Sequence, residues 1–360
     1  MAGISAGRSY RIKNLRSGLY LNVPGYSLSA SKVLEQFSLQ TDSNRQSQVW
    51  HVFPLDYGTY FVANKASGYV MNVTGNSMAP SATAEQFGLQ SPSNNPAQTW
   101  LLRDAGAGSY EVINDRSQLL LHVAGHSKSH SAVVEQFVKL SGDYYDSERW
   151  VFEIEDEYKP VLALSHVANN AIGDIHRMTS FSSTAKDRTD PVEVGAVAYP
   201  YLLVKDPAYD RVRQSRENPY YILRRKGFWS RVYSYEHGGA STLTQKETTH
   251  VGLTTKNSQT IEETVGIKIT HEGGFSLVEG LSAKVATELS YQLKVTATHE
   301  RTEESWRQVT IERSYSAGKR VTEALWYRDD QYTLERLDGT KVLEWTTRDP
   351  NTVITDTYRG

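Results

Sequence analysis

Short apolar stretches that alternate with polar residues run through the first 150 residues of the chain. "SYRIKN" and "LYLNVPG" are separated by a polar turn, and the second stretch ends at a glycine. "EQFSLQ" and "QVWHVF" follow with similar patterning. Apolar residues at every second position, bounded by turn residues, are typical of half-buried β-strands. The pattern therefore predicts four short strands in the first 54 residues.

This four-strand pattern occurs three times with a period of 50 residues and without insertions. The positions that recur in register include Tyr10, Tyr60 and Tyr110; Gly25, Gly75 and Gly125; Glu35, Glu85 and Glu135; and Trp50, Trp100 and Trp150. A period near 50 also fits a propeller blade, but three blades are fewer than propellers use. Three four-stranded units predict a β-trefoil over residues 1–155, with the three Trp in its core.

The repeat ends near "EIEDEYKPV", and residues 156–360 show a different pattern. Thr, Ser, Tyr and Val dominate the last part of the chain, and Val309 and Ile311 alternate with Thr310 and Glu312. This pattern predicts extended, mostly antiparallel sheet. The predicted fold class is all-β, an N-terminal β-trefoil followed by an elongated antiparallel β-sheet domain.

One segment of the second half, residues 261–285, has two amphipathic arms around the turn sequence His271-Glu272-Gly273-Gly274. The residues assigned to its apolar face and turn are Val265, Ile267, Ile269, Gly273, Gly274, Phe275, Leu277 and Leu281. Each arm has the roughly 9–11 residues with which a tilted strand crosses a bilayer. An amphipathic hairpin that covers the core of a soluble sheet has the same pattern, and a stored hairpin satisfies both interpretations.

The composition of the chain excludes several classes of function. The formal net charge of -2 gives no broad attraction to nucleic acid or to anionic lipid. The chain has no cysteine, which excludes disulfides and thiol catalysis. The N-terminus lacks the pattern of a secretory signal, and no run of 18 apolar residues predicts a transmembrane helix. We expect no cofactor and no metal site.

The closing residues of the first two repeats resemble a known lectin signature. Gln48-Val49-Trp50 and Gln98-Thr99-Trp100 are similar to the QxW motif of ricin B-type lectin trefoils, whereas the third repeat keeps only Trp150. The resemblance implies carbohydrate binding, and the positions that match the lectin sites are Asn22, Phe37, Asn72, Phe87, His122 and Phe137. The Asp and the Asn that such lectins place around the sugar are missing, so galactose binding in the familiar geometry is not expected. The three Phe also fit core positions.

The second half carries another resemblance. Pro219-Tyr220-Tyr221-Ile222-Leu223, followed by Arg224-Arg225, resembles a segment of the binary-toxin-like insecticidal crystal proteins, as does the order of the two domains. The resemblance implies an aerolysin-like pore-forming domain at residues 156–360. It further implies an insecticidal toxin, stored in a parasporal crystal, that binds a gut-cell glycan or glycoprotein, self-oligomerises and inserts hairpins into the target membrane as a barrel. Some members of the family act with a second component.

Two other functions compete with the pore-forming toxin. Ricin-like trefoils are often joined to glycoside hydrolases, but the chain has no Gly-x-Ser-x-Gly elbow, no complete His-Glu-x-x-His site and no nucleotide-binding loop. We therefore expect a protein that is not an enzyme. A non-toxic lectin or adhesin shares the trefoil and the binding to cells, and differs in leaving the membrane intact.

Overall fold

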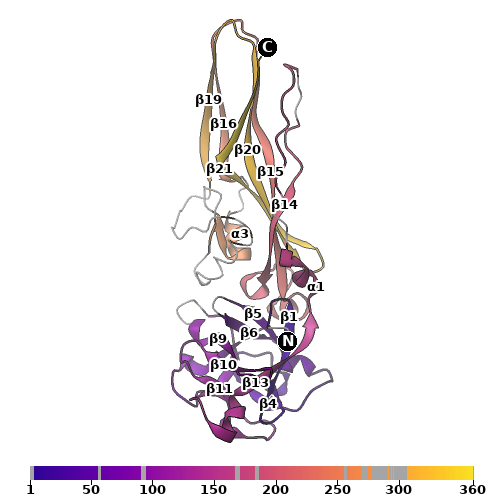
Figure 1. Ribbon diagram of the computed structural model, residues 1–360, viewed down its shortest axis with the longest axis vertical. Coiled ribbons are helices and arrows are strands. Elements are labelled where there is room, and N and C mark those ends of the chain that lie inside the picture. The colour runs from indigo at the N-terminus through magenta and orange to yellow at the C-terminus, as the bar shows by residue number, and fades with distance from the viewer. Residues whose placement is uncertain are drawn as a thin grey trace. The chain divides into compact units, whose positions relative to one another are not determined.

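The computed structural model describes residues 4–55, 58–90, 95–166, 171–182, 186–254, 258–269, 275–277, 291, 293, 295 and 306–359. The chain forms two compact units, which are drawn in Figure 1. The first runs through the three repeats to Ser165 and also contains Ala198–Tyr221. The second contains His166–Val197 and continues from Ile222. The sequence suggests a single boundary near residue 155, whereas a segment of the second half packs within the first unit.

The first unit is a β-trefoil, as predicted. Its strands are β1 (Arg8–Asn14), β2 (Tyr20–Asn22), β3 (Lys32–Val33), β4 (Glu35–Phe37), β5 (Val49–Pro54), β6 (Thr59–Asn64), β7 (Val70–Val73), β8 (Ala84–Phe87), β9 (Thr99–Asp104), β10 (Ser109–Asn114), β11 (Leu120–Val123), β12 (Val134–Phe137) and β13 (Arg149–Glu157). The strands β1, β5, β6, β9, β10 and β13 pair antiparallel in a closed ring. Outside the ring, the repeats contain the equivalent antiparallel pairs β2 with β4, β7 with β8, and β11 with β12.

The core of the trefoil repeats with the sequence. Each set of threefold-related positions contributes buried side chains: Ile12, Val62 and Val112; Leu21, Met71 and Leu121; Val23, Val73 and Val123; Leu34, Ala84 and Val134; Trp50, Trp100 and Trp150. The indole Nε1 of each Trp donates to a carbonyl in its own repeat, that of Leu21, Met71 or Leu121. The interpretation of these Trp as core residues is confirmed.

The Gln of the QxW motif joins two segments of its repeat. Gln48 Nε2 donates to the Ser38 carbonyl over 2.7 Å, and Gln48 Oε1 accepts from the Gln40 N–H over 2.8 Å. Gln98 makes the same two bonds with residues 88 and 90. Because a buried amide can both donate and accept, it satisfies both backbone groups. The motif therefore marks the fold and is not a ligand site.

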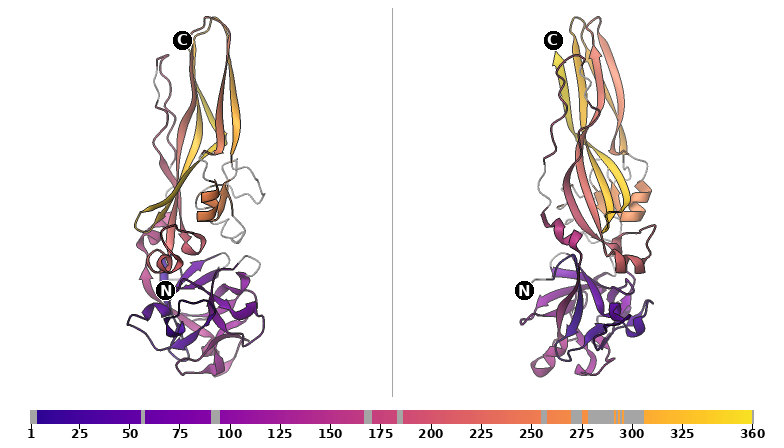
Figure 2. Two further views of the ribbon diagram at one scale, coloured as in Figure 1. Left: turned by 180° about the vertical axis from the view of Figure 1, so that it is seen from behind. Right: turned by 90° about the vertical axis from the view of Figure 1, so that its right-hand side faces the viewer.

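The second unit is built around one antiparallel sheet of long strands (Figure 2). Its order is β14–β15–β20–β21–β16–β19. The strands are β14 (Val192–Pro200), β15 (Tyr220–His237), β16 (Leu243–Leu253), β19 (Trp306–Tyr315), β20 (Val321–Arg336) and β21 (Lys341–Arg359). The predicted alternation in β19 is confirmed, since Ile311 is buried between exposed Thr310 and Glu312.

Both faces of this sheet carry buried residues along β20. Leu325 and Tyr327 belong to a cluster with Val251 and Ile311. The intervening Ala324 and Trp326 belong to another cluster with Ile175 and Met178. Because successive side chains of a strand point to opposite faces, β20 is covered on both sides over this stretch.

The segment that follows β16 differs in part from the predicted hairpin. The predicted extended arm is wrong up to Val265, because Ser258–Val265 forms the helix α3. Ile261 and Val265 are one helical turn apart, so α3 buries both on one face. Within the described ranges, neither α3 nor any other helix has the length and apolar character to cross a membrane.

A short hairpin follows α3. Strands β17 (Ile267–Ile269) and β18 (Phe275–Leu277) pair antiparallel, with Ile267 opposite Leu277 and Ile269 opposite Phe275. Ile267 is buried. Gly273, Gly274 and Leu281, assigned to the same hairpin from sequence, lie outside the described residues. The pairing agrees with a turn between β17 and β18, while membrane insertion stays a prediction.

Candidate functional site

The second-strand positions matched to lectin sites, Asn22, Asn72 and His122, are buried, with exposed fractions of 2%, 1% and 1%. Each contacts the Glu of the same repeat. Asn22 Nδ2 donates to Glu35 over 2.8 Å, and Asn72 Nδ2 donates to Glu85 over 2.9 Å. His122 Nδ1 lies 3.2 Å from Glu135. These side chains use polar atoms inside the protein, so their role in sugar binding stays a prediction.

The three Phe at the positions matched to lectin sites are more exposed than Asn22, Asn72 and His122. Phe37, Phe87 and Phe137 are all half-buried. Phe37 meets His130 edge to face at 5.5 Å between ring centres, and Phe137 stacks on His122 at 5.1 Å. A half-buried ring leaves apolar area for a ligand, and sugar rings present an apolar face to such surfaces.

A loop after the second strand of each repeat forms a surface that the sequence reasoning missed. The loops are the short helical turns η1 (Pro24–Tyr26), η4 (Thr74–Asn76) and η6 (Ala124–His126). The central Gly of each turn has φ of 61 to 64°, which favours glycine. Tyr26, Asn76 and His126 follow with φ of 52, 53 and 56°. Bulky residues in this conformation are uncommon and cluster at functional sites. The repeated Gly before an aromatic or polar residue was the available signal.

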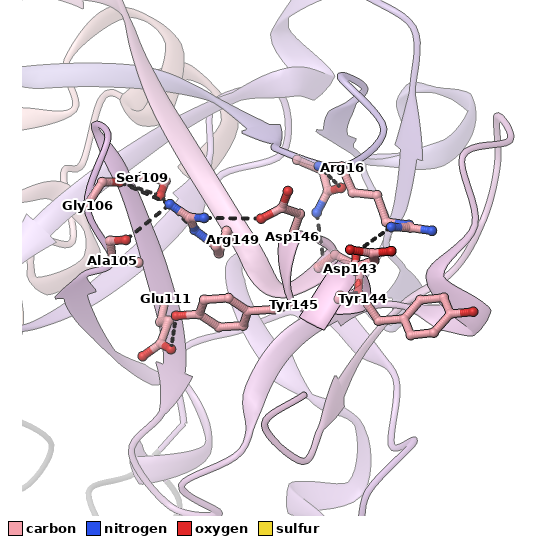
Figure 3. A network of polar contacts seen from close by, with 12 residues as sticks. Arg16, Ala105, Gly106, Ser109, Glu111, Asp143, Tyr144, Tyr145, Asp146 and Arg149 are labelled. Carbon is pink, nitrogen blue, oxygen red and sulfur yellow. Dashed lines mark hydrogen bonds and ion pairs between the residues drawn. The ribbon is translucent and has the colours of Figure 1, made fainter. Parts of the chain in front are cut away.

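The loop of the third repeat belongs to a network of polar and aromatic contacts (Figure 3). The His126 ring lies 4.5 Å from the ring of Tyr144, which is 52% exposed. The Arg16 guanidinium lies 5.1 Å from the Tyr144 ring centre. Arg16 also donates to the backbone carbonyls of His126 and Asp143. Arg16 of the first repeat is thereby held in contact with the loops of the third repeat.

Deeper in the same repeat, Glu111 anchors another part of the network shown in Figure 3. The Tyr145 hydroxyl donates to Glu111, and Lys139 and Arg103 pair with the same carboxylate. Burial alone would raise the pKa of Glu111, but these three partners together lower it. Arg149 pairs with Asp146 over 3.1 Å and so holds the neighbouring helical turn. Tyr145 and Arg149 are therefore positioning groups, whereas Tyr144 points its hydroxyl away from them.

Glu148 replaces the QxW glutamine in the third repeat. Its Oε2 accepts from the Leu140 N–H over 2.9 Å, as Gln48 accepts from Gln40. Within the described part of the chain, its Oε1 has no hydrogen-bond partner. An ionised carboxylate has no proton to donate, so the donor contact of the amide is lost. Burial raises the pKa of Glu148 to about 7, which places a protonated carboxyl within the neutral range.

The segment Ala198–Tyr221 packs on the turn of residues 64–69 in the second repeat. Its helix α2 (Arg211–Glu217) is capped by Asp210, which accepts from the Arg213 N–H over 2.8 Å. The segment donates from Ser215 Oγ to Asn64 O, from Arg216 to Ala66 O, from Arg211 to Ser67 O and from the Tyr201 hydroxyl to Gly68 O. The backbone carbonyls of this turn are therefore hydrogen-bonded to protein donors of the same unit in place of water.

The buried imidazole of His51 also contacts the segment Ala198–Tyr221. His51 Nε2 lies 2.8 Å from the Ser215 carbonyl, which only accepts, so this nitrogen carries the proton. Burial, with the nearby Lys65, lowers the pKa of His51 to about 3. The ring is therefore neutral at neutral pH, and its bond to Ser215 stays intact there.

Gly68 offers a test of this packing. A Cβ at Gly68 would lie 2.7 Å from Arg211 Cγ and 2.9 Å from the Arg211 carbonyl oxygen, whereas at Gly18 its nearest neighbour would be 4.0 Å away. Both glycines have positive φ, 74° and 72°. Gly68→Ala should therefore cost roughly 1–3 kcal/mol more than Gly18→Ala, which carries the backbone strain alone. Thermal unfolding and trypsin cleavage after Arg211, Arg213 and Arg216 would measure the difference. Equal losses in both variants would show that the segment does not pack tightly.

Comparisons with known proteins match the two halves separately. Residues 192–360 match the family model described as Insecticidal Crystal Toxin, P42, and residues 3–87 and 48–137 match the Ricin-type beta-trefoil lectin domain-like model. Insecticidal crystal protein Cry35Ab1 of Bacillus thuringiensis is 28% identical over 116 residues, which are 31% of this chain and 30% of that relative. The alignment thus spans about a third of that curated relative.

A solved structure matches the fold of both units. The crystal structure of Cry35Ab1 covers 99% of this chain and 91% of its own, with a TM-score of 0.77 and 19% identity. The designed 3-fold symmetric protein ThreeFoil matches 40% of this chain and 97% of its own, with a TM-score of 0.37 and 26% identity. The first match extends over both units and supports the all-β arrangement.

Proposed function

We propose that the chain is an insecticidal pore-forming toxin, because its second half matches the insecticidal crystal toxin model, its first half matches the ricin-type trefoil model, and Cry35Ab1 is similar to it in part of the sequence and in fold. Its trefoil docks on a glycan or glycoprotein of the target cell. The second unit then oligomerises and inserts a β-hairpin from each subunit to form a transmembrane barrel. Neither step needs a catalytic residue.

The trefoil supports the docking step with an aromatic and polar surface. The half-buried Phe37, Phe87 and Phe137 offer apolar area, and the loops η1 and η6 carry the partly exposed Tyr26 and His126. Sugar sites combine such rings with a few directed polar groups. We propose that the loops supply those groups, because Asn22 and His122 are already engaged by carboxylates.

The register of β16 and β19 carries the proposal for insertion. These strands pair from Leu243 opposite Tyr315 to Gly252 opposite Trp306, so the residue numbers of each pair add to 558. If both strands lengthen in this register, the chain reverses at residues 278–280, because half of 558 is 279. Gly280 suits such a turn. The whole segment between β16 and β19 then becomes two arms of one hairpin.

The sequence of that segment has the alternation that a membrane hairpin needs. The apolar odd-numbered positions are Ile261, Val265, Ile267, Ile269, Phe275, Leu277, Leu281, Ala283, Val285, Leu289, Tyr291, Leu293, Val295 and Ala297. The even-numbered positions from Thr254 to Thr298 are polar or small except Val278, and Glu279 interrupts the apolar set beside it. Because 558 is even, odd positions pair with odd ones, and both arms present their apolar residues on one face. Strands of membrane barrels alternate in this way between lipid and lumen.

The described hairpin has a different register, so insertion requires a change of pairing. Ile267 lies opposite Leu277 in the β17–β18 pair, whereas continuation of β16 and β19 would place it opposite Tyr291. The helix α3 would also have to unwind. We propose that β17, β18 and α3 form the stored state of the hairpin, in which Ile261, Val265 and Ile267 are kept buried.

The remaining parts of the proposal follow from the family. We propose storage in a parasporal crystal, action at the target-cell membrane and self-association in the pore. A second toxin component is also proposed as a partner, since the family includes binary toxins.

Dye release tests the proposed function. The full chain is added to liposomes that carry insect gut-cell glycoproteins, and to matched liposomes without them. We expect leakage from the first set and little from the second, because docking raises the local concentration of subunits. Binding without leakage, before and after protease treatment and in the presence of the second component, would favour a lectin or adhesin instead.

A further inference from the structure

Position 16 of the first repeat lies at the border between repeats. The Arg16 N–H donates to the Asp146 carbonyl over 3.1 Å, and the Arg16 side chain reaches the His126 carbonyl. The turn of the third repeat makes the equivalent bond, from the Arg116 N–H to the Pro96 carbonyl over 3.2 Å. Each of these turns therefore lies beside the loops of the preceding repeat.

At the border between the third and first repeats, Arg16 and Tyr144 form a partly exposed pair. Arg16 lies over the ring of Tyr144, and, among the residues that the structure describes, it forms no ion pair with a carboxylate. Its guanidinium donates to two backbone carbonyls, which carry no net charge and leave its positive charge uncompensated. Figure 3 shows the Tyr144 hydroxyl directed away from the network. Half of the tyrosine surface is exposed.

At the second border the trefoil has Ala66 in place of an arginine, and helix α2 supplies one. Arg216 donates from Nε and Nη2 to the Ala66 carbonyl at 3.1 and 2.8 Å. Its guanidinium lies 5.5 Å from the ring centre of Tyr26. Tyr26 stands on the loop of the first repeat and bonds to Gln46 over 3.1 Å. As far as the described residues extend, Arg216 has no carboxylate partner either.

We propose that these two pairs, Arg16 with Tyr144 and Arg216 with Tyr26, bind the anionic substituent of an acidic sugar, a carboxylate or a sulfate. The inference rests on the proposed docking to glycans and adds the class of glycan. It also makes residue 216, which follows the trefoil by more than fifty residues in the chain, a specificity residue of the first repeat.

The chemistry of the two pairs suits this ligand. A guanidinium presents a planar fork of N–H donors that matches the two oxygens of a carboxylate or a sulfate. The tyrosine face orients the guanidinium and offers area for the sugar ring. Because the net charge of the chain is -2, general attraction cannot supply this preference, and the local pairs must do so.

The test measures binding of the full-length protein to lactose, 3′-sialyllactose and 6-sulfated lactose by calorimetry. We expect at least one of the two acidic sugars to bind about tenfold or more tightly than lactose, since hydrogen bonds to charged groups contribute strongly. Arg16→Gln and Arg216→Gln should each remove part of this difference, and the double variant should abolish it. Sialyllactose and the sulfated sugar distinguish a carboxylate site from a sulfate site.

Two further variants separate charge from geometry. Arg16→Lys keeps the charge and loses the planar fork, so it should retain less than half of the preference. Arg116→Gln is the matched control, because the loop η4 of the second repeat carries Asn76 where the other loops carry Tyr26 and His126. It should leave binding unchanged.

Four results would overturn the inference. Equal affinity for lactose and the acidic sugars, or an unchanged preference in the folded double variant, would show that the pairs do not recognise an anion. Binding of lactose alone would leave glycan docking in place and refute only the acidic specificity. Absence of binding to every sugar would refute both.

Discussion

A protein with Lys268→Cys and Ser276→Cys is expected to release no dye from liposomes while oxidised, and to recover full leakage after reduction. These residues are opposite each other in the β17–β18 pair, and the native chain has no other cysteine to interfere. A disulfide here holds the stored register. Continuation of β16 and β19 would move Lys268 opposite residue 290, which the disulfide prevents.

The matched control places a disulfide where both states have the same pairing. Thr248 and Thr310 are opposite each other in β16 and β19 and are exposed, so Thr248→Cys with Thr310→Cys should leak equally before and after reduction. Gel mobility under non-reducing conditions would confirm that each disulfide forms. Leakage by oxidised Lys268→Cys/Ser276→Cys protein would refute the change of register.

Replacement of Glu148 by Gln should stabilise the first unit at alkaline pH and reduce its dependence on pH. Burial raises the pKa of Glu148 from 4.5 to about 7, so the folded state binds its proton more tightly than the unfolded chain does. Its favourable contribution is complete below about pH 4.5 and is lost as pH rises through 7. A shift of this size corresponds to roughly 3 kcal/mol. The Gln amide can also donate in the way that Gln48 does to Ser38.

Calorimetry at pH 5 and pH 8.5 measures this effect. Glu148→Gln should raise the transition temperature of the first unit by several degrees at pH 8.5 and change it little at pH 5. The reverse change, Gln48→Glu, places the same carboxyl in the first repeat and should add a second loss of stability across that range. Parallel pH profiles for native and Glu148→Gln proteins would show that Glu148 ionises without strain.

The trefoil could be predicted because each of its core positions recurs three times in the sequence, at a spacing of 50 residues. Trp50, Trp100 and Trp150 occur in register, and threefold packing follows from that spacing. The burial of Asn22 was less evident, because it depends on Glu35 of the facing strand. The triple repetition of that Glu, together with a polar residue in the second strand, was a signal for the pairing.

Other features depend on contacts that a local pattern does not record. Ile261 and Val265 fit a strand and also the four-residue spacing of a helix, and α3 adopts the second. The position of Arg216 over Tyr26 joins residues 190 apart in the chain. No periodicity near residue 216 indicates which turn of the trefoil will receive it.

The packing of Ala198–Tyr221 on the trefoil has a consequence for protein engineering. Exchange of the trefoil between related proteins by a single cut would treat it as a contiguous piece of the chain. Here such a cut near residue 155 would take the trefoil away from Ser215 and Arg216, and would leave the carbonyls of residues 64–68 without their donors. A chimaera that keeps its head intact would therefore be assembled from two crossovers, with the α2 segment transferred alongside the repeats it completes.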